Sequence, residues 1–176
     1  MPIDPRSILL FGCNALLLLL TQLVNSSLAN WSLHLVLFGP MLVLPALYLR
    51  HGSFFLCLLL TGLWTDAALP VSNGFFTISF LIAGTGIFVM RHRFRTEHNY
   101  HPLVIAHTVN LASILLLAFS MGPGALTSPG YWIQVTVTLL LSHLTLLAVA
   151  PWFFNFERML FSLLPVDTEP EDLPIH

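Results

Sequence analysis

Long apolar runs separated by short polar stretches dominate the chain. The runs can be delimited at about 7–24, 31–49, 53–69, 75–90, 103–121 and 131–150. Each holds roughly 16–20 residues, and a helix of that length covers roughly 24–30 Å, close to the hydrocarbon thickness of a bilayer. The pattern predicts an all-α integral membrane protein, a bundle of six transmembrane helices that form a single domain over residues 1–165.

Two regions modify this picture. The second run contains Gly39, Pro40 and Pro45, and because proline removes a helix hydrogen bond we expect a kink there. After the sixth run, residues 152–164 could form an interfacial helix that lies flat on the inner surface, with Glu157 and Arg158 toward water. The acidic, proline-containing tail at 166–176 is predicted to be disordered.

Composition supports lipid as the solvent of this chain. Hydrophobic residues make up 56% of the sequence and charged residues only 8%, whereas soluble domains carry roughly 25% charged residues. The net charge of −2 gives no bulk field that would attract nucleic acid. Cys13 and Cys57 both fall in apolar runs, so we interpret them as small hydrophobic residues without a disulfide framework.

The arginines predict the orientation of the bundle. On a path of six spans, every arginine falls on the same side, and the alternate loops contain none. These residues are Arg6, Arg50, Arg91, Arg93, Arg95 and Arg158. The positive-inside rule makes that side cytoplasmic, with both termini inside. Residues 91–95 are then expected to form a cytoplasmic basic loop that contacts anionic lipid headgroups or a protein partner.

Asp66 stands out because it lies in an apolar run, in the stretch GLWTDAALPVSNG at 62–74. A charge in mid-membrane costs at least about 2.5–3.5 kcal/mol, and less near an interface, so Asp66 can be tolerated there if it faces the protein interior. Gly62 lies one turn earlier on the same face, where it would let a neighbouring helix approach closely. Asp66 is either a ligand, proton carrier or partner contact, or a hydrogen-bond acceptor that closes the helix end and the turn at 71–74.

Other polar residues within the spans are expected to turn inward and to bond to neighbouring helices, or alternatively to line a small polar cavity. They are His34, His107, Asn110, Gln134 and His143. His107 and Asn110 are three residues apart and share a helix face. Around His92, His98, His101 and His107, no cysteine or carboxylate other than Glu97 could complete a tight metal set, so a solvated basic loop is favoured over a metal site. No nucleophile constellation or phosphate-binding loop is present, so we expect neither an enzyme nor a cofactor.

One part of the chain resembles a known family. Gly62-Leu63-Trp64-Thr65-Asp66, a turn with Gly74, the apolar helix FFTISFLIAGTGIFV and a basic exit resemble the MreD family of bacterial rod-shape-determining membrane proteins, over about 52–95. The resemblance implies a non-enzymatic protein of the inner membrane that acts in cell elongation and peptidoglycan synthesis with MreC-like partners. It also implies that Gly62, Asp66, Asn73 and Gly74 form a family-signature element, shaping a partner-binding face or a central cavity.

An alternative of another class remains open. The same six-helix plan resembles the substrate-binding membrane subunits of energy-coupling-factor vitamin transporters. Those proteins bind a small molecule on the outer side, and the resemblance implies that Asp66, Asn73 and Asn110 would contact it. Hydropathy does not separate the two alternatives, because both proteins solve the same lipid-packing problem.

Overall fold

The computed structural model describes residues 4–70, 72, 74–94, 100–120 and 123–162, which form helices and no strand. The elements are α1 (Pro5–Leu28), the 3-10 turn η1 (Ala29–Trp31), α2 (Gly39–Tyr48), α3 (His51–Ala68), α4 (Phe75–Phe94), α5 (Tyr100–Ser120), the short α6 (Pro123–Leu126) and α7 (Pro129–Ser162). The expectation of an all-helical chain is confirmed for these residues. The predicted tail at 166–176 lies outside them.

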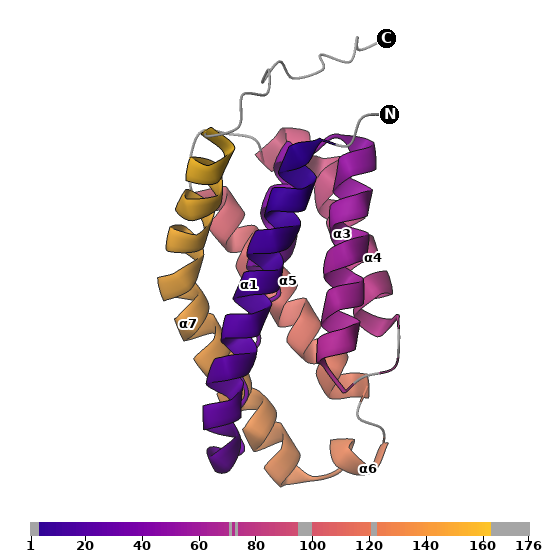
Figure 1. Cartoon of the computed structure of the whole chain (residues 1–176). Helices are drawn as coiled ribbons and strands as arrows, with labels where there is room; N and C mark the ends of the chain where they lie inside the picture. Colours follow the sequence, from indigo (N-terminus) through magenta and orange to yellow (C-terminus); the bar gives the residue numbers. More distant parts are fainter. Residues whose placement is uncertain (1–3, 71, 73, 95–99, 121–122, 163–176) are drawn as a thin grey trace.

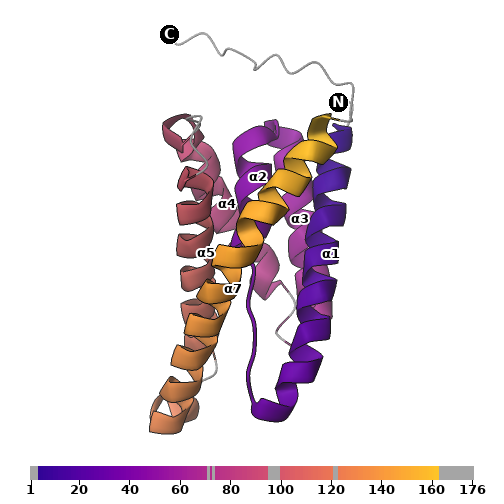
Figure 2. The same cartoon turned by 90° about the vertical axis from the view of Figure 1, so that its left-hand side faces the viewer.

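The long helices run up and down along the long axis of the bundle (Figures 1 and 2). Helices α1, α3 and α5 run one way, and α2, α4 and α7 return. By length and hydropathy, three stretches are able to cross a membrane, namely Pro5–Trp31, Pro102–Ser120 and Pro129–Ser162. The apolar helices Gly39–Tyr48 and Phe75–Arg91 are shorter. The protein is therefore a membrane protein with at least three helices of spanning length.

The second apolar run differs from the prediction, because the helix expected over 31–49 begins only at Gly39. Ser32 has a left-handed backbone with φ of 53° and ends the turn η1. Residues 33–38 have no regular secondary structure and run as an irregular segment toward α2 (Figure 2). Pro40 explains where α2 starts, because proline has no N–H and suits the first turn of a helix.

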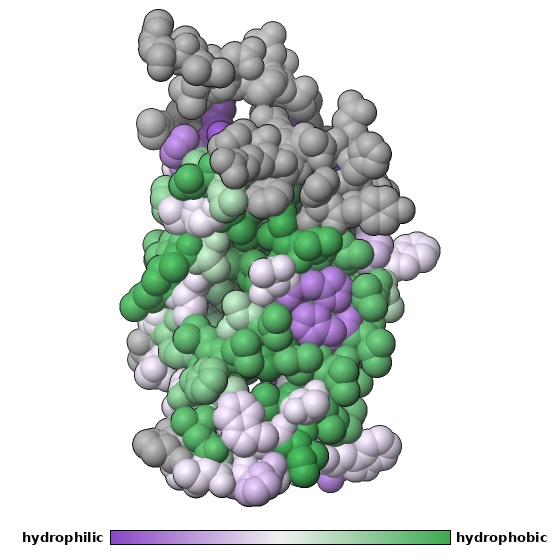
Figure 3. All heavy atoms as spheres, turned by 180° about the vertical axis from the view of Figure 1, so that it is seen from behind, coloured by the Kyte–Doolittle hydropathy of each residue, from purple (hydrophilic) through white to green (hydrophobic). Residues whose placement is uncertain are grey.

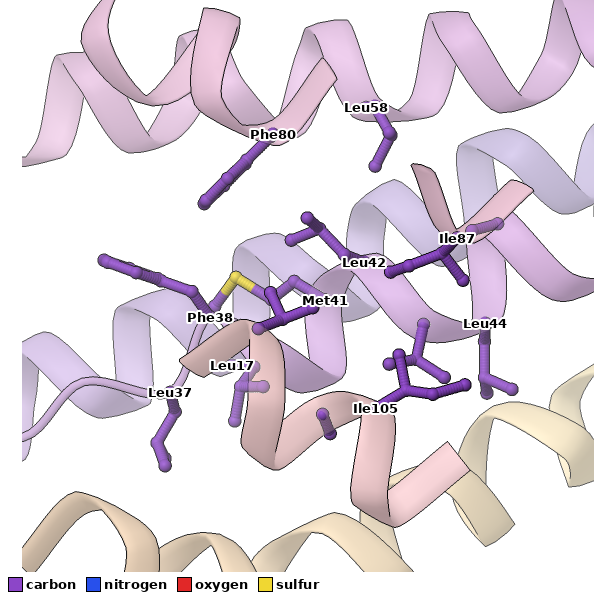
Figure 4. Close-up of a cluster of buried hydrophobic side chains, with 14 of the residues drawn as sticks. Leu17, Leu37, Phe38, Met41, Leu42, Leu44, Leu58, Phe80, Ile87 and Ile105 are labelled. Carbon is purple, nitrogen blue, oxygen red and sulfur yellow. The ribbon is translucent and has the colours of Figure 1, made fainter. Parts of the chain in front are cut away.

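Helix α2 forms the centre of the bundle. Every residue from Gly39 to Leu47 is buried, and α2 contacts α1, α3, α4, α5 and α7. Figure 4 shows Met41 and Leu42 of α2 surrounded by side chains of other helices, among them Leu58, Phe80 and Ile105. A helix that is apolar all round is typical of such an enclosed position. The outer helices therefore separate α2 from lipid.

The sixth run also extends further than expected. Residues 152–162 are helical, as predicted, but they continue α7 through Pro151 to Ser162 without a break and do not form a helix of their own. We call residues 152–162 the α7 arm. Figure 2 shows α7 crossing the bundle diagonally, from α5 at its start to α1 at its end. The arm packs on the bundle because Phe161 contacts the ring of Tyr48 and the guanidinium of Arg6.

Four elements that carry arginine meet at one end of the bundle, which we call the arginine end. The start of α1, the α2–α3 turn, the end of α4 and the end of α7 lie there (Figure 1). They contain Arg6, Arg50, Arg91 and Arg158, respectively. The predicted basic loop at 91–95 is wrong in its first part, because α4 remains helical to Phe94 and includes Arg91 and Arg93. Arg95 lies outside the described residues.

Candidate functional site

Asp66 connects the end of α3 to the start of α4. Its carboxylate accepts hydrogen bonds from the backbone N–H groups of Gly74 at 3.0 Å, Phe76 at 2.8 Å and Thr77 at 3.1 Å. The Thr77 hydroxyl donates a fourth, at 2.6 Å. The first N–H groups of a helix have no intrahelical acceptor. Asp66 supplies that acceptor to α4 from a different helix.

Two glycines make this connection possible. Gly74 has φ of +90°, a left-handed conformation that glycine adopts without strain, where the chain turns into α4. A Cβ at Gly62 would lie 2.5 Å from the Thr77 Cα. Only a glycine at 62 lets the two backbones come so close. We call Gly62, Asp66, Gly74 and Thr77 the α3–α4 clasp.

The clasp has a defined chemical capacity. A carboxylate offers about four acceptor positions, and Asp66 receives four donors, three on Oδ2 and one on Oδ1. The side chain is also buried. Of the two interpretations of Asp66, its contacts favour the acceptor that closes the helix end over a ligand or partner contact. Asn73, the remaining signature residue, lies outside the described residues.

Two asparagines compensate for the prolines of α2. In a regular helix the N–H of residue 45 would bond to the carbonyl of Met41, but Pro45 has none. Instead, the Asn14 Nδ2 of α1 donates to that carbonyl at 2.9 Å. Asn14 also donates to the Thr61 hydroxyl, at 3.1 Å. One side chain thus ties α1 to both α2 and α3.

Asn110 acts in the same way at the start of α2. Its Nδ2 donates to the carbonyl of Val36 at 3.0 Å, the group that the N–H of a non-proline residue 40 would meet in a longer helix. Its Oδ1 accepts from the N–H groups of Phe38 at 3.0 Å and Gly39 at 3.4 Å. Asn110 is fully buried, so the expectation that it turns inward is confirmed.

Further side chains hold the non-helical residues 33–38 and the serine before them. Asn25 of α1 donates to the carbonyl of Leu35 at 2.9 Å and accepts from its N–H at 2.7 Å. Ser142 of α7 accepts from the N–H of Val36 at 3.0 Å, and Gln134 donates to the carbonyl of Ser32 at 3.0 Å. Non-helical backbone at membrane depth is tolerated when protein groups satisfy it in this way.

His107 of α5 and His143 of α7 form a pair. Their Nδ1 atoms lie 2.7 Å apart, the ring centroids are 4.9 Å apart and the ring planes differ by 14°. These values describe two nearly coplanar rings that meet edge to edge, with one proton between the facing Nδ1 atoms. The expectation that both residues bond to a neighbouring helix is confirmed. His34, by contrast, is exposed.

Sequence reasoning missed Asn14, Asn25 and Ser142 and placed Glu157 toward water, although Glu157 is 0% exposed. The prolines of α2 were a usable signal for the asparagines, because a proline in an apolar segment leaves a carbonyl that needs a donor.

Within the described ranges, no three His, Cys, Asp or Glu residues are placed to hold a metal ion. Figure 3 shows a back surface that is largely apolar, with a hydrophilic patch at mid-height.

Comparison with known proteins adds no relative. No protein-family model, no curated protein and no solved structure matches this chain.

Proposed function

We propose that this protein is a non-enzymatic scaffold of the bacterial cell-elongation machinery, of the MreD type, in the inner membrane. The observation that carries the proposal is the α3–α4 clasp. Gly62, Asp66 and Gly74, which carry the resemblance to that family, meet at one place and join two helices. A joint of this kind, which fixes two helices against each other, suits a protein whose task is to present a fixed shape.

The arrangement of the arginines supports the membrane topology in this proposal. Four of them belong to elements that meet at the arginine end (Figure 1). The positive-inside rule makes that end cytoplasmic. We propose six passes through the bilayer, the second made by residues 33–38 together with α2, and both termini in the cytoplasm. The buried position of α2 makes its short length acceptable, since the surrounding helices shield its ends from lipid.

The use of the polar side chains favours a scaffold over a transporter subunit. A substrate-binding site needs polar groups that are free to meet the substrate. Asp66 and Asn110 are two of the residues that the transporter alternative requires. Their side-chain oxygens instead accept hydrogen bonds from backbone N–H groups of this chain. The proposed partners are MreC-like membrane proteins that pack against lipid-facing apolar side chains.

Copurification tests the proposal. A tagged chain would be extracted from native membranes in mild detergent, and the accompanying proteins would be identified by mass spectrometry. Enrichment of a single-span, coiled-coil periplasmic protein together with wall-synthesis enzymes is the expected result. Enrichment of paired ATPases with a coupling membrane subunit would contradict it and favour the transporter alternative. An untagged chain extracted in parallel gives the background.

A further inference from the structure

Glu157 is an acidic residue that is buried without a hydrogen-bond partner among the described residues. It lies in the α7 arm with 0% exposure. Neither of its carboxyl oxygens has a hydrogen-bond partner among the described residues. Leaving a carboxylate buried without a partner is so costly that such a group takes up a proton instead. The geometry therefore requires the neutral acid whenever the arm is packed.

None of the described titratable groups near the arm donates a hydrogen bond to Glu157. Cys13 of α1 and Cys57 of α3 lie near Glu157 itself, close enough to interact with its charge. Arg158 is the next residue of the arm, and Arg6 of α1 and Tyr48 of α2 contact the arm through Phe161. Arg6 lies over the ring of Phe161 at 5.7 Å, and neither arginine hydrogen-bonds to the carboxyl group.

The α7 arm has the means to move. Pro151 directly precedes it and lies inside α7. Proline removes one helix hydrogen bond, and kinks in helices concentrate at such sites. The opposite face of the arm is open, since Trp152 and Met159 are 80% and 56% exposed. The arm also ends at the arginine end (Figure 1).

We propose that Glu157 is a proton-binding site that latches the α7 arm onto the bundle. With a proton on the carboxyl group, the arm packs on α1 next to Cys13. When the O–H bond breaks, the proton passes to water, the carboxylate keeps the electron pair, and the arm swings out at Pro151 so that the charge is hydrated. Rising pH at the arginine end therefore releases the arm. This inference goes beyond the scaffold function and does not depend on it.

The chain contains its own reporters for this motion, because its two cysteines are both buried beside Glu157. Labelling of Cys13 by N-ethylmaleimide would be followed by mass spectrometry across a pH series, with the full chain in lipid nanodiscs. Thiol reactivity itself depends on pH, so each rate is divided by that of Glu157→Gln, which stays neutral. Release of the arm frees one proton. The ratio of the two labelling rates is therefore expected to rise by up to about tenfold per pH unit until the arm is fully released. A ratio that stays constant across the series overturns the proposal.

Glu169→Gln is a charge-matched control from the C-terminal stretch and should label like the wild type at every pH. If Glu157→Gln accumulates poorly, hydrogen exchange of the wild type replaces the labelling. Backbone amides of residues 152–162 should then gain exchange with pH more steeply than those of α3, which report the intrinsic pH effect. An equal pH response in the two helices would overturn the proposal as well.

Discussion

Two carboxyl groups are buried in the described part of this membrane protein, and their surroundings are opposite. Asp66 at the end of α3 receives four hydrogen bonds from α4 and the turn before it. Glu157 in the α7 arm receives none from the described residues. The first group meets the N-terminal end of a helix, where unpaired N–H groups favour negative charge. The second is buried near Cys13 of α1 and Cys57 of α3 without a donor.

The difference shows two ways in which a membrane protein can bury a carboxyl group. A carboxylate that organises backbone donors becomes part of the framework, because the donors and the acceptor satisfy each other. A carboxyl group without donors is compatible with burial only as the neutral acid, so its packing depends on a proton. The substitutions below separate the two cases, from the largest expected effect to the smallest.

Asp66→Ala should be the most damaging substitution. It leaves three backbone N–H groups and one hydroxyl in the clasp without an acceptor, at about 1–3 kcal/mol for each buried orphan. We expect the free energy of unfolding in bicelles to fall by about 3 kcal/mol or more. Asp4→Ala is the matched control, since Asp4 caps α1 through a single bond from the N–H of Arg6, at 3.0 Å, and should cost about 0.5–2 kcal/mol. Equal losses in the two variants would contradict the role of the clasp.

Gly62→Ala should come next. The added Cβ would meet the backbone of Thr77, which cannot yield as a flexible side chain would. Overpacking of this kind costs about 1–3 kcal/mol. Gly12→Ala and Gly86→Ala serve as controls because nothing lies within 4 Å of a Cβ at either position. These helical sites should be neutral or gain about 0.5–1 kcal/mol. If thermal unfolding shows no difference between Gly62→Ala and the controls, the close approach is not structural.

The compensation of Pro45 by Asn14 predicts a coupling. Asn14→Ala should destabilise the wild type by leaving the carbonyl of Met41 without a donor. In a Pro45→Ala background the N–H of residue 45 can reach that carbonyl, so the same substitution should cost about 1 kcal/mol less. A double-mutant cycle on unfolding free energies measures the difference. Additive effects would show that Asn14 does not replace the missing N–H.

The histidine pair should give the smallest effect. Interhelical hydrogen bonds in membranes average about 0.6 kcal/mol. His107→Ala and His143→Ala remove the same Nδ1 contact, so the double variant should lose about that much less than the sum of the singles. Unfolding of the four proteins in one bicelle preparation provides the comparison, and a strictly additive result would argue against the shared proton.

The sequence was most informative where hydropathy and turn chemistry agree. The apolar runs located α1, α3, α4 and α5 to within a few residues, and Asp66 with Gly62 pointed to a close helix contact near a turn. The lack of helix at residues 33–38 was not predicted, because their pattern is as apolar as that of a helix. Side chains distant in sequence form the hydrogen bonds that support this segment. The burial of Glu157 was not predicted for a related reason. Its burial follows from the diagonal course of α7, which is a tertiary property that a local pattern does not contain.

The contrast between the two carboxyl groups is tested most directly by their isosteric amides. Asp66→Asn and Glu157→Gln each remove one potential charge while keeping the shape, and their unfolding free energies would be measured side by side in bicelles at neutral pH. With its amide oxygen in the place of Oδ2, Asp66→Asn keeps the bonds from Gly74 and Thr77 but sets an amide donor against the N–H of Phe76. We therefore expect a loss of about 1–3 kcal/mol. Glu157→Gln resembles the neutral acid and should stay within about 0.5 kcal/mol of the wild type. Equal losses, or a larger loss for Glu157→Gln, would contradict the account.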